Sequence, residues 1–488
     1  MASGELSIRG LGRPARPSDA DAVERVLDLT GEVFAGQRRR GGVAVHGTSL
    51  AQVGDDPVQA VPSYAGAMHD VVVIGAGLAG LRCAGLLAGE GLDVLVVEAG
   101  DSVGGRQRTD IVDGFRLDRG FQVLNPAYEA LRRSVDLDRL TMGSFPVGVR
   151  VRTDDGVAEL RHPLRHPLSI VSTLRSGLVN VSDVVALARW AAPALVQPLS
   201  RLAEYDVPLR DGWDAAGLRG TLRTAVLTPF LAGVLAEDRG ATSNAFARLL
   251  VRYFVFGRPG LPAQGIAAVP EQLADRARAA GADVLFHARA EQVSARGDGV
   301  QVQLEGGDAI RAQRAVVAVG PDAVADLTEL PRPVTNGLQT WWFASDEPPT
   351  ASALLTVDGR GRGPVVNTVV MTHTVPSYAP AGRHLIAATC LLPRDTDAAG
   401  EDDVRRHLRE IWGVDVGSWD LLRRDDIVDA LPAQPAPLRP ARAPRYAERL
   451  YVAGDHRDTA SIQGALASGE RAARAILQVA GSPTRTRA

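Results

Sequence analysis

Three glycines near position 75 have the spacing of a phosphate-binding turn. The six residues GAGLAG place them at Gly75, Gly77 and Gly80, between an apolar run at 71–74 and a stretch of helical pattern at 78–89. Gly75 permits a tight turn, Gly77 lets the backbone approach a pyrophosphate, and Gly80 allows the helix to pack closely on the strand. The free N–H groups at the amino end of the helix attract an anion. The spacing therefore predicts a dinucleotide site.

An acidic residue follows at the distance that such a site needs. Glu98 comes directly after a second apolar run at 94–97, where a carboxylate accepts hydrogen bonds from the ribose hydroxyls of adenosine. An acid at this position, in place of an arginine, disfavours a 2′-phosphate. The two apolar runs and the helical stretch between them predict a βαβ unit.

Two further segments carry the same kind of chemistry. Gly104, Gly105 and Arg106 come soon after Glu98 and suit a loop whose backbone and guanidinium contact the same pyrophosphate. Near the other end of the chain, LYVAGD at 450–455 is followed by SIQGALASG at 461–469.

These separated motifs resemble the FAD-dependent amine oxidase superfamily, which also contains phytoene desaturases and protoporphyrinogen oxidases. The segment Ala290-Glu291-Gln292-Val293 and the apolar stretch at 315–321 are similar to two more parts of that family's pattern. The similarity covers residues 69–482 and is strongest at the two ends.

The resemblance implies FAD as the cofactor and gives a role to several residues. In the family, the backbone at the position of Val293 pairs with adenine, and the acid at Asp455 in the Gly454-Asp455 pair binds the ribityl and phosphate region. The helix expected to start near Gly464 points its amino end at flavin O2, where a helix dipole stabilises negative charge on the reduced flavin. Ile462, just before it, is a further candidate cofactor-binding residue. Enzymes that use NAD have no need of this second motif. We expect FAD to be held without a covalent bond, because neither cysteine lies in the C-terminal motif.

The substrate regions resemble the phytoene desaturase side of the superfamily more than the amine oxidase side, most clearly at 229–234. Ser461 stands where amine oxidases place a tyrosine of their aromatic cage, and the chain contains no lysine to hold a water near the flavin. The favoured function is a desaturase-like or dehydrogenase-like oxidoreductase that moves hydride from an apolar organic substrate to flavin N5. The alternatives are a flavin-containing amine oxidase that produces peroxide, and a non-catalytic flavin-binding partner protein.

The expected fold is α/β, with a discontinuous Rossmann-type FAD-binding domain and an inserted α+β substrate domain. Residues 1–67 are rich in Gly, Arg, Asp, Ser and Pro and are expected to be a weakly ordered extension that the nucleotide site does not need. The predicted FAD-binding domain is 69–150, 260–330 and 440–482, and the predicted substrate domain is 151–259 and 331–439.

Composition excludes several other classes. A net charge of −3 gives no excess of basic residues for binding nucleic acid. Because the chain has no lysine, catalysis through a lysine Schiff base is excluded. The chain has no apolar run of about 18 to 20 residues, and its two cysteines, Cys83 and Cys390, fit a reducing compartment. We expect a cytoplasmic protein, with peripheral membrane contact or a substrate tunnel as alternatives to an ordinary helical cap for the apolar stretch 170–202.

Other candidate residues carry less weight. His162 and His166 have helical ligand spacing, but the prolines after them and the lack of a nearby acid argue against a metal, so no metal site is predicted. Trp341 and Trp342 are expected to pack in a core more than to face a ligand. His456 directly follows the Gly-Asp pair and is a minor candidate for a place near the flavin.

Overall fold

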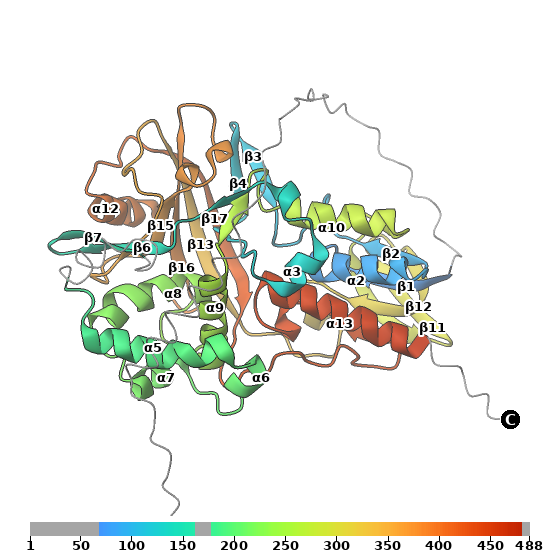
Figure 1. Cartoon of the computed structure of the whole chain (residues 1–488). Coiled ribbons are helices and arrows are strands. Elements are labelled where there is room, and N and C mark those ends of the chain that lie inside the picture. Colours follow the sequence, from blue (N-terminus) through green and yellow to red (C-terminus); the bar gives the residue numbers. More distant parts are fainter. Residues whose placement is uncertain (1–67, 162–176, 481–488) are drawn as a thin grey trace, which may run out of the picture.

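The computed structural model describes residues 68–161 and 177–480, and these form two seven-stranded sheets with helices packed on them (Figure 1). The expected extension at 1–67 and the two histidines at 162 and 166 lie outside the described residues. The first sheet has the order β10-β11-β12-β1-β2-β9, and β18 pairs with β12. Its strands are β1 (Met68–Ile74), β2 (Val94–Val97), β9 (Asp283–Leu285), β10 (Ala290–Arg296), β11 (Gly299–Leu304), β12 (Ala309–Val317) and β18 (Leu450–Val452).

The core of this sheet is parallel and buried on both faces. Strands β1, β2, β9, β12 and β18 pair in parallel, and β10, β11 and β12 form an antiparallel meander. Along β1, Val71 and Val73 pack into the cluster that contains the helices, whereas Val72 and Ile74 pack into the cluster that contains the meander. This double burial explains why β1 and β2 read as unbroken apolar runs in place of an alternating pattern.

Three long helices cover the first of these two faces. They are α2 (Leu78–Gly89), α10 (Ala268–Ala279) and α13 (Ile462–Ala480), and Figure 1 shows them side by side on the nucleotide-fold half of the molecule. The limits of α2 and β2 agree with those predicted from the sequence.

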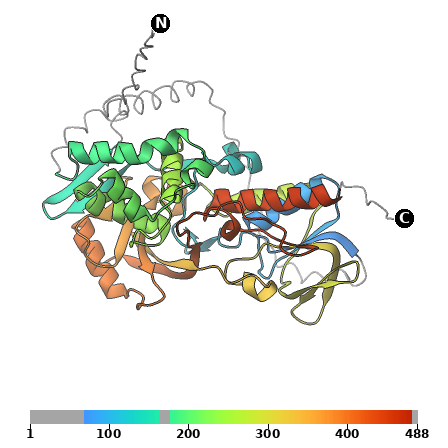
Figure 2. The same ribbon diagram turned by 90° about the horizontal axis from the view of Figure 1, so that it is seen from below.

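The second sheet has the order β17-β13-β16-β15-β14-β6-β7. Helix α12 (Glu401–Trp412) packs on β14 and β15, and a group of helices covers another side, with α8 against β14 to β16 (Figure 2). The strands are β6 (Gly148–Thr153), β7 (Gly156–Arg161), β13 (Thr335–Ser345), β14 (Leu355–Asp358), β15 (Val365–Val370), β16 (His384–Leu392) and β17 (Asp420–Pro432); the helices are α5 (Val181–Val196), α6 (Leu199–Leu202), α7 (Leu209–Ala216), the π-helix η2 (Leu222–Leu227), α8 (Thr228–Leu235) and α9 (Asn244–Phe256).

The remaining elements are short. They are the hairpin β3 (Thr109–Val112) and β4 (Phe115–Asp118), the pair β5 (Met142–Ser144) and β8 (Gly260–Pro262), the helices α3 (Glu129–Ser134) and α11 (Val324–Leu327), and the turns η1 (Asp138–Leu140), η3 (Met371–His373), η4 (Pro376–Tyr378) and η5 (Asp455–Arg457).

The mixed α/β architecture is as expected from the sequence, whereas the limits of the two domains stay a prediction. The first part of β6 falls within the range predicted for FAD binding, yet this strand pairs with β7 and β14 in the second sheet.

Among the described residues, no helix is both long and apolar enough to cross a membrane. Within the stretch 170–202, the described part forms α5 and α6, and Trp190 of α5 is buried against α7 and α9. Membrane contact stays a prediction.

A buried carboxyl ties the two halves together. Asp118, at the end of β4, is only 1% exposed and accepts hydrogen bonds from Thr109 Oγ1 (2.6 Å), the Ile266 N–H (3.0 Å) and the Tyr378 hydroxyl (2.8 Å). Burial raises the pKa of Asp118 to about 6, against the effect of these donors. One side chain thus joins β4, the segment before α10 and η4.

Helix α13 lies against α2 at backbone distance. Gly469 has no side chain, and a Cβ added there would overlap the carbonyl oxygen of Ala79. One residue later, the buried Glu470 pairs with Arg82 of α2 and Arg133 of α3, both at 3.0 Å. Although burial acts in the opposite direction, these two arginines hold the pKa of Glu470 below its usual value. The contact therefore fixes where α13 begins relative to the glycine turn.

We predict that Gly469→Ala lowers the free energy of unfolding by about 1 to 3 kcal/mol, because the added methyl group must push two packed helices apart. Gly89→Ala is the matched control. Gly89 is the last residue of α2 and has open space where a Cβ would stand, so alanine there should stabilise by up to about 1 kcal/mol. Denaturant midpoints at equal FAD concentration would measure both. A Gly469→Ala midpoint equal to that of wild type would contradict the close contact.

Candidate functional site

The predicted site residues lie at the carboxyl ends of parallel strands. Strand β1 ends just before Gly75, β2 just before Glu98, and β18 two residues before Gly454. Because β12 pairs with both β1 and β18 in parallel, these ends meet at one edge of the sheet. In open parallel sheets this edge is where ligands bind.

The glycine turn has the conformation that its residue types require. Gly75 has φ +104°, and a Cβ there would lie 2.8 Å from the carbonyl oxygen of Ala318 at the end of β12. A Cβ at Gly80 would overlap the carbonyl oxygen of Gly75. Gly77 differs, because it has an ordinary φ of −77° and no atom within 4 Å of the place for a Cβ. Two of the glycines thus shape the turn, and the third leaves space in front of α2.

The second glycine pair lies directly against this turn. Gly104 donates its N–H to the Ala76 carbonyl at 2.9 Å, and Gly77 and Gly104 form a parallel bridge. Gly105 is also close, since a Cβ on it would be 3.6 Å from the Gly77 Cα. Both residues have positive φ, +119° and +59°. The loop predicted to share the pyrophosphate therefore lies beside Gly77.

Arg106 connects this loop with the C-terminal motif. Its Nη2 donates to Asp455 Oδ1 at 2.6 Å, and its Nη1 donates to the Ala430 carbonyl at 2.8 Å. The Asp455 side chain is 6% exposed, and that of Arg106 is 37% exposed. A salt bridge across a separation of 349 residues brings two predicted cofactor residues together and joins both to β17.

Glu98 accepts a backbone N–H on each carboxylate oxygen, one of them from the glycine turn. Oε2 accepts the Ala76 N–H at 2.7 Å, and Oε1 accepts the Gly100 N–H at 2.9 Å. A carboxylate oxygen has more than one lone pair, so this arrangement fixes the carboxylate and leaves it able to accept further donors such as ribose hydroxyls.

Val293 lies farther from the turn than the other predicted residues. It is partly buried on β10, at the end of the meander. The chain just before β10 does reach the site, since Ala288 donates its N–H to the Glu98 carbonyl at 2.9 Å and His287 donates to Gly100. No described contact joins Val293 itself to the glycine turn, and its role toward adenine stays a prediction.

The C-terminal motif forms a turn and the start of α13. Gly454 has φ +151° and donates its N–H to Ser468 Oγ at 3.1 Å. Ser461 caps the helix, because its Oγ accepts the Gly464 N–H at 3.0 Å. Ile462 is the first residue of α13, so the helix begins two residues before the start predicted near Gly464. The first N–H groups of such a helix have no partner within it.

Sequence reasoning missed the groups that the second sheet brings to the site. The loop after β4 lies between the two sheets: Gly120 donates its N–H to Asp425 Oδ2 at 3.3 Å, and Phe121 donates to Thr340 Oγ1 at 3.1 Å. Gln122 Nε2 donates to the Arg106 carbonyl at 2.7 Å, and its Oε1 accepts from Gln107. These contacts depend on pairing between β13 and β17, for which no local motif exists.

The two tryptophans lie in cores, as expected. Trp341 is 2% exposed and packs with α12, while Trp342 is fully buried in the main core and donates Nε1 to Asp425 Oδ2 at 2.9 Å. Among the described residues no cluster of side chains could hold a metal ion.

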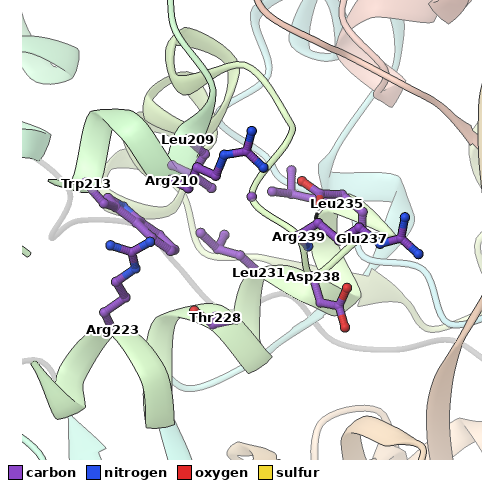
Figure 3. A pocket seen from close by; sticks show the side chains of 11 residues that line it. Leu209, Arg210, Trp213, Arg223, Thr228, Leu231, Leu235, Glu237, Asp238 and Arg239 are labelled. Atoms are coloured by element: carbon purple, nitrogen blue, oxygen red, sulfur yellow. Dashed lines mark hydrogen bonds between the residues drawn. The ribbon is translucent and has the colours of Figure 1, made fainter. Parts of the chain in front are cut away.

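A separate, small hollow lies in the helical part (Figure 3). Leu209, Leu231 and Leu235 line it together with several arginines and acids, and Trp213 lies on one side. None of the predicted site residues lines it. The hollow therefore belongs to the helices of the second sheet and not to the glycine turn.

Comparison with known proteins assigns the family. The family model described as flavin containing amine oxidoreductase matches residues 78–477, most of the chain. The chain belongs to this family. It is accordingly an FAD-dependent oxidoreductase, and the resemblance drawn from the motifs is confirmed.

Relatives of two kinds are found. A hydroxysqualene dehydroxylase of Rhodopseudomonas palustris is 28% identical over 453 residues, which cover 83% of this chain and 98% of the relative. A protein of Mycobacterium tuberculosis, provisionally named a flavin-containing monoamine oxidase, is 27% identical over 268 residues, 52% of this chain and 57% of the relative.

A solved structure supports the fold. An oxidoreductase from Methanosarcina mazei superposes with a TM-score of 0.64 at 17% identity, over 85% of this chain and all of that one. At this identity the likeness establishes the architecture alone.

The glycine turn of this flavoenzyme fits an FAD diphosphate. The open space at Gly77, the neighbouring Gly105 and the amino end of α2 form a cradle that a Cβ at Gly77 would enter. Arg106, the residue after Gly105, supplies a guanidinium that pairs with Asp455 of the C-terminal motif. The residues present are those that an extended dinucleotide needs.

We predict that Gly77→Ala folds normally but binds FAD at least about tenfold more weakly, because the methyl group meets no protein atom and would meet the diphosphate. Gly400→Ala is the matched control, since Gly400 is also an N-cap glycine with extended backbone and open space. The FAD content after gel filtration and the FAD dissociation constant measure the effect. Equal FAD binding by both variants would place the diphosphate elsewhere.

Proposed function

We propose that this flavoenzyme oxidises an apolar organic substrate at carbon, as a desaturase-like or dehydrogenase-like oxidoreductase. When bound, FAD would supply the hydride acceptor at flavin N5. The chain would hold and orient the cofactor through the glycine turn, Glu98, Arg106 and Asp455, and the amino end of α13 would favour negative charge near its first residues. Apolar packing around the substrate would exclude water and set the reacting C–H bond close to its acceptor.

The observation that carries this proposal is the structural role of Ser461. Its hydroxyl caps α13, so the position that amine oxidases use for a cage tyrosine serves here to begin a helix. The chain also has no lysine. Similarity over 83% of the chain to a relative whose name gives hydroxysqualene as its substrate supports the same direction.

Amine oxidation with release of peroxide is the second candidate, favoured by the shorter match to the mycobacterial relative. An amine substrate would need an aromatic wall, and Trp341 and Trp342 were considered in the sequence as residues that could face a ligand. Both residues belong to β13, and both side chains are buried in hydrophobic cores. The third alternative, a flavin-binding protein without turnover, is not retained, because the family is one of oxidoreductases.

Binding of FAD without a covalent bond also stays a proposal. Both cysteines are buried, and burial raises the pKa of each thiol to about 12, so neither is a reactive thiolate at neutral pH. The measurement of FAD release described below for His456 tests this as well, since a covalently bound flavin is not released on dilution.

We predict that anaerobic holoprotein loses its oxidised-flavin absorbance with apolar polyenes or hydroxylated isoprenoids at least about tenfold faster than with primary amines, secondary amines or polyamines. Stopped-flow absorbance with one substrate at a time measures the rates, and holoprotein without substrate is the control. Rapid bleaching by an amine, with no bleaching by any apolar compound, would replace this proposal with the amine oxidase function.

A further inference from the structure

His456 is a buried histidine directly after the Gly454-Asp455 pair. It is 6% exposed, and its ring lies so close to Gly454 that a Cβ added there would overlap ring atoms. Glycine at 454 is therefore required by the ring of His456 as well as by its own positive φ. The local chain is shaped around this imidazole.

Neither ring nitrogen of His456 has a hydrogen-bond partner among residues 68–161 and 177–480. The buried His407 in the second sheet shows the usual arrangement, since its Nδ1 accepts the Val365 N–H at 3.0 Å and its Nε2 lies 2.7 Å from Asp358 Oδ2. Leaving a buried polar group unsatisfied costs about 1 to 3 kcal/mol, and folded proteins avoid it. The ring nitrogens of His456 therefore indicate a hydrogen-bond partner that is not one of the described residues.

The charge state of this imidazole suits a neutral hydrogen bond. Burial lowers the pKa of His456 to about 4; Asp455 acts against this shift, and Arg457, Arg106 and Arg442 add to it. At neutral pH the ring therefore carries one N–H donor and one acceptor nitrogen.

His456 lies beside residues that are predicted to hold FAD. Asp455, the residue before it, pairs with Arg106, and Arg106 follows the two glycines that lie against Gly77. His456 therefore belongs to the same cluster of groups as the cradle that fits an FAD diphosphate. FAD offers the partners that the ring of His456 lacks. Its ribityl hydroxyls can donate or accept a hydrogen bond, and its phosphate oxygens can accept one.

We propose that His456 is a direct hydrogen-bonding contact of FAD, beside the Arg106-Asp455 pair, and that it slows release of the cofactor. The inference rests on the family's use of FAD and does not depend on which substrate is oxidised. A failure of the apolar-substrate proposal would leave it intact.

The test compares His456→Phe, which keeps a ring without polar atoms, with His456→Gln, which keeps an N–H donor. We expect His456→Phe holoprotein to release FAD at least about tenfold faster than wild type, and His456→Gln to stay within about threefold. Flavin fluorescence after dilution gives the release rate. His407→Phe is the control for loss of a buried histidine away from the cofactor motif and should release FAD at the wild-type rate.

Two results would overturn the inference. Release from His456→Phe at the wild-type rate would show that the polar atoms of the ring make no contact that holds FAD, and equally fast release from both variants would show that a hydrogen-bond donor at position 456 does not hold FAD. Should His456→Phe fail to fold, wild-type holoprotein labelled with ¹⁵N-histidine decides the question. A ring N–H that exchanges slowly, is absent from His456→Gln and disappears when FAD is removed would support the contact, and its absence would refute it.

Discussion

The whole candidate site depends on the pairing of β12 with both β1 and β18. Strand β1 carries the glycine turn and β18 carries the C-terminal motif, and some 375 residues of sequence separate them. Because both are parallel to β12, their carboxyl ends emerge at the same edge. Loss of the three-residue β18 would remove the strand that brings Asp455 and His456 to the edge that carries Gly77.

Close approach of backbones completes this arrangement. Gly80 allows α2 to lie against the turn, and Gly469 allows α13 to lie against α2. The Arg106-Asp455 salt bridge then joins the turn to the C-terminal motif, and its second hydrogen bond to Ala430 extends the connection to β17 in the other sheet. Hydrogen bonds from the loop at 120–122 to Asp425 and Thr340 also join this loop to the second sheet. The cofactor cradle thus lies where the two sheets are tied together.

The parts that the sequence could predict are those in which local pattern determines structure. Helix α2 and strand β2 have the predicted limits, because an apolar run, a glycine turn and a helical period are all local signals. A motif of the same local kind predicted the start of α13 near Gly464, and the helix begins two residues earlier, at Ile462. Family resemblance then supplied the cofactor, which composition and spacing alone could not have chosen.

Other features could not be read from the sequence, because they arise from long-range pairing. The bond between Arg106 and Ala430 and the loop at 120–122 depend on the register of β13 and β17. His456 was a minor candidate in the sequence, since nothing local shows that both its nitrogens lack partners. Val293 was selected by resemblance, and the structure places it on β10 with no described contact to the turn. The identity of the substrate could not be predicted either, because the residues that line an apolar cavity share no sequence motif.

The central claim is that the glycine turn, the Arg106 loop and the C-terminal motif hold one FAD molecule. A crystal structure of the FAD-loaded protein tests it most directly. The account predicts a diphosphate in the space in front of Gly77, adenosine ribose hydroxyls at Glu98, and Asp455 and His456 within hydrogen-bonding distance of the cofactor. A flavin bound elsewhere, such as in the hollow beside Trp213, or a diphosphate remote from Gly77 and Arg106, would contradict it.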